Sequence, residues 1–316
     1  MGHHHGHSHT SNGKALSIAF WLNLSFSIIE VIGGILTNST AILADAFHDF
    51  MDAMAIGSAV LLEKISGKKR SSKFSYGYKR FTLLSALGMA VFLLIGAVGM
   101  IIKAVESFMQ PHEVNSTGMV WLALLGIAIN GFAFLKIRKS NKEGQKEDCD
   151  HSHGHSHAHN HGSNHNSRAV MLHLLEDVLG WVAVLIGAIV IHFTNWFWID
   201  PLLAIGIALF ISYNATNIMI STMKIFLQSV PEDVNVEDLS KELQNIEGIQ
   251  SFHDLHIWTM DGNYNIGTLH IVVKDSNIPL MEQINKKVMN LMKQYNIQHP
   301  TLQLETTEDH CGLVHC

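Results

Sequence analysis

Residues 45–52 read DAFHDFMD, a run with four ionisable side chains inside a segment, 40–62, that is otherwise mostly apolar. A second run, HLLED at 173–177, lies inside another apolar segment, 168–192. Ionisable groups at the depth of a bilayer cost about 2.5–3.5 kcal/mol each on insertion scales, so each one needs a reason. Both segments are long enough to cross a bilayer, and the two runs therefore indicate a polar site between membrane helices.

Six segments have the length and apolar character of membrane-spanning helices, which need about 20 mostly apolar residues. They lie near 15–36, 40–62, 81–107, 117–136, 168–192 and 198–226. Only 15% of the 316 residues are charged, whereas soluble proteins carry about 25%. We therefore predict a polytopic α-helical membrane protein, with residues 15–228 as its transmembrane domain. For the second and fifth segments, which carry charges in their first halves, the alternative is an amphipathic surface helix.

Basic residues are confined to alternate loops. The loop between the second and third spans contains seven Lys or Arg, and the stretch after the fourth contains five. The loops at 37–40, 110–117 and 192–200 contain none. By the positive-inside rule, the basic loops and both termini face the cytoplasm.

Histidine is the most unusual feature of the composition, with 22 residues against 21 Lys and Arg together and a net charge of −6. The absence of a basic field argues against a nucleic-acid partner, and three Cys make no disulfide framework. Histidine is a common metal ligand. Two His-rich tracts, 1–14 and 148–167, are predicted to lie in the cytoplasm. The second is predicted to bind metal by composition, in a buffering or delivery role. The alternative for the loop is a polar linker.

Both intramembrane runs contain His-x-x-x-Asp, as His48 with Asp52 and His173 with Asp177. Four residues advance a helix by about 6 Å and slightly more than one turn, so the imidazole and the carboxylate share a face. Two such helices facing each other would offer four ligands, the number that Zn²⁺ takes in a tetrahedral shell. Two imidazoles and two carboxylates carry −2, which a divalent cation cancels. Because ligands must be deprotonated to bind, metal release is linked to proton uptake, and metal–proton exchange is the natural hypothesis.

Spacing alone leaves open which groups coordinate. Asp45 and Asp49 lie on the same stripe of the helix as the first pair, and Glu176 adjoins the second. Glu30, in the first span, is better interpreted as a structural or proton-path residue. The alternative to a metal site is intramembrane charge pairing that holds helices together.

From about residue 229 the chain has the composition of a soluble domain. A helix at 236–246, strands at 249–258 and 265–273, a helix at 278–295 and a strand at 300–305 are expected, with Gly262 and Asn263 in the turn between the first two strands. This order fits a ferredoxin-like α+β fold for residues 229–316, placed in the cytoplasm.

Four stretches of this sequence resemble the cation diffusion facilitator family, in particular its zinc-type members of the cobalt–zinc–cadmium resistance kind. They are GGILTNSTAILADAFHDFMDA (33–53), FSYGYKR (74–80), HLLEDVLGWVAV (173–184) with WIDP (198–201), and HDLHIW (253–258) with TLHIVV and HPTLQLE. The resemblance covers the chain from residue 15 onward. It implies six transmembrane helices, a ferredoxin-like cytoplasmic domain, a homodimer, and export of Zn²⁺, with Co²⁺ or Cd²⁺ as alternates, in exchange for protons.

The resemblance also implies which residues bind metal. The transport site of the family falls on His48, Asp52, His173 and Asp177, and a histidine in the first of these positions resembles the zinc-preferring members. A further zinc site that some relatives have in the loop between spans two and three is not expected here, because SSKFSYGYKR has no His or Asp.

In the cytoplasmic domain, the resemblance implies that the regulatory metal positions of the family fall on His253, His270 and Glu305. An additional His of one relative aligns with Gln303, which is not a ligand. His299 is a candidate fourth ligand, and His256 is either a ligand or a structural residue. The tail adds a Cys pair beside two His, a pattern that suits zinc, although an untethered tail is the alternative. The candidate zinc ligands of this domain are therefore His253, His270, His299, Glu305, Cys311 and Cys316.

Two other functions fit the sequence less well. An intramembrane metalloenzyme would need a motif such as HExxH, which is absent, and four protein ligands leave no open position for catalytic water. A membrane-bound metal sensor or storage protein would explain the His-rich tracts. It would not explain two His-x-x-x-Asp pairs inside the membrane, so we predict a transporter and no enzymatic activity.

Overall fold

The computed structural model describes residues 9–66, 68, 70–147, 162–274 and 278–306, without the side chains at 9–19, 59–60, 63–64, 136–147, 162–173 and 278. By its internal contacts the chain divides into two compact units. One contains residues 1–60 and 89–216, and the other contains residues 61–88 and 217–316. The first is a bundle of long helices, and the second includes a small C-terminal sheet.

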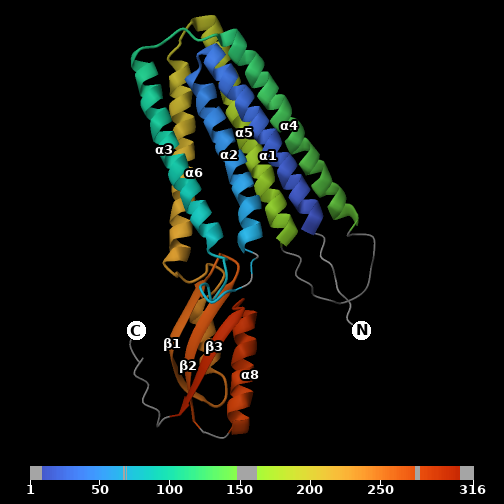
Figure 1. Ribbon diagram of the computed structural model, residues 1–316, viewed down its shortest axis with the longest axis vertical. Helices are drawn as coiled ribbons and strands as arrows, with labels where there is room; N and C mark the ends of the chain where they lie inside the picture. Colours follow the sequence, from blue (N-terminus) through green and yellow to red (C-terminus); the bar gives the residue numbers. More distant parts are fainter. Residues whose placement is uncertain (1–8, 67, 69, 148–161, 275–277, 307–316) are drawn as a thin grey trace. The chain divides into compact units, whose positions relative to one another are not determined.

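In the part of the chain that the structure describes, six long helices precede the sheet, and Figure 1 shows them lying side by side with their axes roughly aligned. They are α1 (His9–Thr37), α2 (Thr40–Ser66), α3 (Phe81–Met109), α4 (Ser116–Glu147), α5 (Gly162–Thr194) and α6 (Ile199–Phe226). Within the described residues, five of them are long and apolar enough to cross a membrane. The exception is α2, which has 27 residues but contains Asp45, Asp49 and Asp52. Five of the six predicted spans are thus confirmed as candidate membrane helices, and the crossing by α2 remains a prediction.

The outward faces of the apolar helices are covered with large apolar side chains. Such a surface suits lipid rather than water, because soluble monomers rarely expose contiguous apolar patches of this extent. Residues more than half exposed include Trp21, Leu36, Ile95, Ile102, Trp121, Phe132, Leu179, Ile186, Phe193 and Tyr213.

Helix α2 lies against several neighbours. One buried cluster joins its Ile42 to Phe26 of α1, Met119 of α4 and Trp181 of α5. On α4, Gly126 leaves room for the indole of Trp181, which a Cβ there would overlap. A second cluster joins Ala41 and Ala44 of α2 to Ala104 of α3 and Ala204 of α6. Small side chains at these contacts let helices approach closely.

The start of α2 is fixed by a buried carboxylate. Helix α1 ends at Thr37, and Asn38 follows with a φ of +56°, a left-handed conformation that asparagine tolerates. Asp200, at the start of α6 and 1% exposed, accepts hydrogen bonds from the Thr40 amide at 2.7 Å, the Thr40 hydroxyl at 2.6 Å and the Ser39 hydroxyl at 2.5 Å. It also accepts a bond from the Ala41 amide at 3.3 Å. Asp200 therefore satisfies first-turn amides of α2 and complements the positive end of its dipole.

The C-terminal domain contains α7 (Val236–Gln244), β1 (Ile249–Thr259), β2 (Asn265–Val273), α8 (Ile278–Gln294) and β3 (His299–Thr306). Its sheet has the order β1-β2-β3, with β1 antiparallel to β2 and β2 parallel to β3. The predicted order of helices and strands is confirmed, and element ends differ from the expected ones by at most two residues. Gly262, with a φ of +90°, lies in the β1–β2 turn as expected.

The two helices of this domain pack on the sheet through apolar side chains spaced three or four residues apart. Leu239 and Leu243 of α7 and Ile284 and Val288 of α8 join a buried cluster with Leu269 and other strand residues. A hydrogen bond links the helices, because the Tyr295 hydroxyl donates to Oε1 of Glu242 at 2.8 Å. This bond to a carboxylate raises the pKa of Tyr295 to about 12.

We expect Asp200→Ala to destabilise the membrane unit by about 3 kcal/mol or more, because several buried donors lose their acceptor and each costs about 1–3 kcal/mol. Thermal unfolding of the purified protein in detergent measures the change. Ser116→Ala is the matched control, since its hydroxyl contacts Nδ1 of His192 at 3.2 Å in an exposed position, and its effect should stay within about 0.5 kcal/mol. Equal effects of the two substitutions would show that Asp200 does not hold α2.

Candidate metal centres

Helix α2 places its ionisable side chains along one face. Asp45, His48, Asp49 and Asp52 follow one another at spacings of three and four residues, so they are neighbours on the helix surface. Nε2 of His48 lies 3.6 Å from Oδ2 of Asp52. Asp45 is 7% exposed and the other three are partly buried. The predicted imidazole–carboxylate pair of this helix thus lies side by side.

Helix α5 brings a further carboxylate to this region. Asp177 interacts electrostatically with Asp45, and a Cβ built on Gly180, one turn further along α5, would lie 3.9 Å from Oδ1 of Asp45. Its neighbour Glu176 is exposed. His173 lies four residues before Asp177 in α5, but its side chain is outside the described residues.

Helix α1 adds Glu30, which is 1% exposed. Its carboxylate interacts electrostatically with Asp45, Asp49 and Asp177. Acidic side chains from three helices therefore gather in one part of the bundle. Like charges repel strongly in a medium of low dielectric constant, so this gathering calls for a bound cation or for protons.

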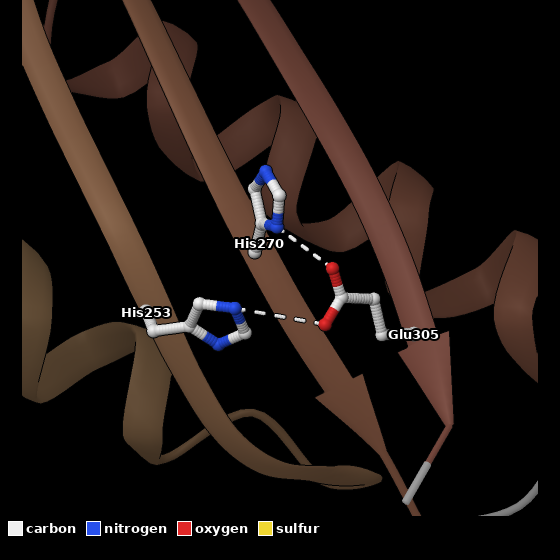
Figure 2. A group of neighbouring side chains, drawn as sticks. All are labelled: His253, His270 and Glu305. Atoms are coloured by element: carbon white, nitrogen blue, oxygen red, sulfur yellow. Dashed lines mark hydrogen bonds and ion pairs between the residues drawn. The ribbon is translucent and has the colours of Figure 1, made fainter. Parts of the chain in front are cut away.

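A second cluster crosses the C-terminal sheet. His253 of β1 pairs with His270 of β2, and Glu305 lies on β3 opposite the residue two positions beyond His270. Figure 2 shows the Glu305 carboxylate reaching both imidazoles, with Oε1 2.7 Å from Nδ1 of His270 and Oε2 3.6 Å from Nε2 of His253. The structure thus brings together three of the six ligands predicted in this domain.

These three residues suit a metal ion. One ligand atom from each lies within 4.8 Å of the others. Tetrahedral ligands at about 2.0–2.2 Å from one zinc ion lie about 3.3–3.6 Å apart, so side-chain movements of about 1 Å would complete such a shell. Within the described part of the chain, Nε2 of His253 is buried without a hydrogen-bond partner. A buried polar atom without a hydrogen bond is costly, and the 3.6 Å contact with Glu305 is too long for one, whereas coordination to a metal ion would compensate for the loss.

His299 lies elsewhere in the same domain. It begins β3 opposite Ile266, its Nδ1 is 3.4 Å from the hydroxyl of Tyr264, and its ring packs edge-on against Tyr76. Lys79 lies 3.4 Å above the Tyr264 ring. His299 is therefore part of an aromatic contact with the segment that precedes α3, and not of the three-residue cluster. Cys311, Cys316 and the tract at 148–161 lie outside the described residues.

One carboxylate at the cluster was not expected from the sequence. Asp254 follows His253, and its Oδ2 lies 3.7 Å from Nε2 of His270. Its Oδ1 is 2.8 Å from Nε2 of His256, which places His256 at the edge of the group with about half of its side chain exposed. Adjacent residues of a regular strand point to opposite faces, so the strand pattern gives no sign that Asp254 reaches the same histidine as His253.

Comparison with known proteins identifies both regions. Residues 16–227 match the cation efflux transmembrane domain, and residues 231–307 match the cytoplasmic domain of cation efflux proteins, a dimerisation domain. The cadmium, cobalt and zinc/H(+)-K(+) antiporter of Bacillus subtilis is 32% identical over 319 residues, covering 100% of this chain and 96% of the relative. The metal cation efflux system protein CzcD of Cupriavidus metallidurans is 32% identical, covering 96% and 90%. The zinc transporter ZitB of Yersinia pseudotuberculosis is 33% identical, covering 98% and 92%.

These matches, which together span nearly the whole chain, define a membrane transporter of metal cations. The chain belongs to the cation efflux family, the cation diffusion facilitators that its motifs resemble. The predicted family and transport function are confirmed. Because the family and these relatives are transporters, the alternative of an intramembrane metalloenzyme is excluded.

We expect His253→Ala to remove about one tightly bound zinc ion per chain, whereas His299→Ala should leave zinc binding unchanged. Equilibrium dialysis of the purified full-length variants, followed by elemental analysis, measures the difference. The His-rich tracts are present in every variant, so their contribution cancels. Loss of the same zinc ion in His299→Ala would contradict the position of His299 outside the cluster.

Proposed function

We propose that this protein exports Zn²⁺ from the cytosol in exchange for protons, with Co²⁺ and Cd²⁺ as alternate substrates. The transport site consists of His48 and Asp52 of α2 with His173 and Asp177 of α5. The observation that carries the proposal is the pairing of His48 with Asp52 at 3.6 Å, in a part of the bundle where Asp177 interacts with the acidic residues of α2. The zinc and antiporter functions in the names of the bacterial relatives support it.

The charges of the site favour exchange over simple release. One divalent cation balances the charge of two neutral imidazoles and two carboxylates. When the cation leaves, these ligands can bind protons instead. Glu30, Asp45 and Asp49 add acidic groups that interact electrostatically with Asp177. In alternating access, the site opens first to the cytosol, where zinc binds, and then to the other side, where protons displace it. A nitrogen and oxygen shell suits Zn²⁺, whereas an all-carboxylate shell would suit harder ions such as Mn²⁺.

The topology we propose has six crossings, with α2 as the sixth. Its acidic face is tolerable in a membrane because such groups face the bundle interior and bind a cation. The basic loops and both termini then lie in the cytoplasm. Since the named relatives are bacterial, we place the protein in a bacterial inner membrane.

The cytoplasmic domain makes the protein a homodimer and senses metal in this proposal. The match of residues 231–307 to the dimerisation domain of the family supports the dimer. His253, His270 and Glu305 would hold a regulatory zinc ion, which supplies positive charge between their side chains. Zinc at this site would bring the two cytoplasmic domains together when the cytosolic concentration rises.

Zinc uptake into inverted or reconstituted vesicles under an imposed pH gradient tests the transport proposal. We expect Asp177→Ala to reduce gradient-driven uptake by at least about 100-fold, since loss of a residue that merely supports a ligand already costs about 10–100-fold. Glu176→Ala is the matched control, because it removes an adjacent but exposed carboxylate of the same helix. Its uptake should remain close to that of the unmodified protein.

Equal uptake by Asp177→Ala and the unmodified protein would move the transport site elsewhere. If no form takes up zinc although the purified protein binds it, the transport proposal fails and a membrane-bound metal sensor or storage protein becomes the better interpretation.

Pulsed electron paramagnetic resonance tests the sensing step. A spin label attached through an unnatural amino acid at Lys286, an exposed position on α8, leaves all cysteines intact. We expect the distance between the labels of two protomers in membranes to shorten when zinc is added, and to remain unchanged in His253→Ala. An unchanged distance in the unmodified protein would remove the sensing step while leaving the transport proposal intact.

A further inference from the structure

We propose that Asp254 is a positioning residue for the cytoplasmic metal site, and that it acts by holding the far nitrogen of His270. This inference rests on the proposed binding of metal by His253, His270 and Glu305. It assigns Asp254 and His256, the other two polar residues of the HDLHIW run, to the support of that site.

The imidazole of His270 lies between two carboxylates. Its Nδ1 is 2.7 Å from Oε1 of Glu305, and its Nε2 is 3.7 Å from Oδ2 of Asp254. The side chains of His270 and Asp254 are 10% and 11% exposed, so water competes little for these positions. The second distance is slightly longer than a hydrogen bond, and a closure of about half an ångström would make it one.

The backbone of β1 is shaped to bring Asp254 to this place. The pairing of β1 with β2 shifts register between His253 and His256, and Asp254 has a φ of +54°. An extra residue in one strand bends it and redirects side chains. As a result, both His253 and Asp254 reach His270, with the rings of His253 and His270 only 5.1 Å apart.

The chemistry of histidine ligands explains what such a carboxylate does. A histidine that binds metal through one nitrogen commonly donates the N–H of the other to a carboxylate, which fixes the tautomer and the ring orientation and makes the ligand more basic. If Nδ1 of His270 faces the metal together with Glu305, then Nε2 donates to Asp254. His256 in turn donates from Nε2 to Oδ1 of Asp254, over 2.8 Å, and orients that carboxylate.

The charge of the group fits the same assignment. His253 and His270 are neutral as ligands, and Glu305 alone supplies one negative charge. Asp254 adds the second, so that a divalent cation is balanced within a largely buried cluster. Without Asp254 the bound ion would leave one positive charge uncompensated in a place where that is costly.

Two substitutions separate positioning from a purely structural role. The left-handed backbone of residue 254 tolerates Asn and Gly, so Asp254→Asn and Asp254→Gly should both keep the bulge. Asn still offers an oxygen to Nε2 of His270 but lacks the charge, whereas Gly offers nothing. Asp261→Asn is the matched control, because Asp261 accepts hydrogen bonds from the Asn263 and Tyr264 amides in the turn of the same hairpin.

Zinc affinity is measured by competition with a chromophoric chelator on the full-length protein in detergent, and the zinc ion lost in His253→Ala defines the site. We expect Asp254→Gly to weaken zinc binding at that site by about 10–100-fold. The zinc affinity of Asp254→Asn should lie between those of Asp254→Gly and the unmodified protein. At saturating zinc both variants should still bind the full number of ions, and their melting temperatures without zinc should match that of Asp261→Asn. Partial recovery by Asn with unchanged stoichiometry is the sign of positioning, since local unfolding would remove the site outright.

Zinc affinity of Asp254→Gly within about twofold of the unmodified protein would overturn the role of Asp254 while the metal site itself stands. If His253→Ala loses no zinc, both the cytoplasmic metal site and this inference fall. The vesicle uptake experiment is independent of either result.

Discussion

Carboxylates inside an apolar helix bundle must be neutralised, and this constraint governs the membrane unit. Glu30 of α1, Asp45 and Asp49 of α2 and Asp177 of α5 interact electrostatically with one another. Their repulsion is large where the dielectric constant is low. In the proposed cycle, a divalent cation relieves it in one state and protons relieve it in the other. The need to keep the same groups neutral throughout the cycle therefore supports the proposed exchange of metal for protons.

The constraint also explains why several hydrogen bonds hold the start of α2. A helix with an acidic face gains less from apolar surroundings than its neighbours do, so specific polar contacts must add to the apolar packing that positions it. Asp200 provides them, because its carboxylate accepts hydrogen bonds from Ser39, Thr40 and the Ala41 amide. The first turn of α2 is thereby tied to the start of α6. The ionisable residues begin only one turn later, so these hydrogen bonds fix the position of the ionisable residues along the bundle axis.

Periodicity and turn residues were enough to predict the helices, the strands and their order, because these depend on local pattern. The crossing by α2 was harder to predict, since the acidic residues that mark the proposed site also lower the hydropathy of this helix. Within the sheet, His299 and Glu305 are six residues apart and share a face, but a strand rises about 3.3 Å per residue, which separates them by about 20 Å. Asp254 could not be predicted, because its orientation depends on a register shift and a left-handed residue that strand alternation does not reveal.

The two proposed metal sites use similar ligands on scaffolds of different rigidity. In the membrane, His48 and Asp52 belong to one helix and Asp177 to another, and helices in a bundle are held together by side-chain packing, which can be exchanged for another arrangement. In the cytoplasmic domain, His253, His270 and Glu305 lie on three strands joined by backbone hydrogen bonds, so their separation is nearly fixed. A site whose halves can part is able to release its ion on the other side of the membrane. A site held by strand pairing can bind and report the ion but cannot carry it, and this difference in rigidity supports the proposal that the helices transport the ion and the sheet senses it.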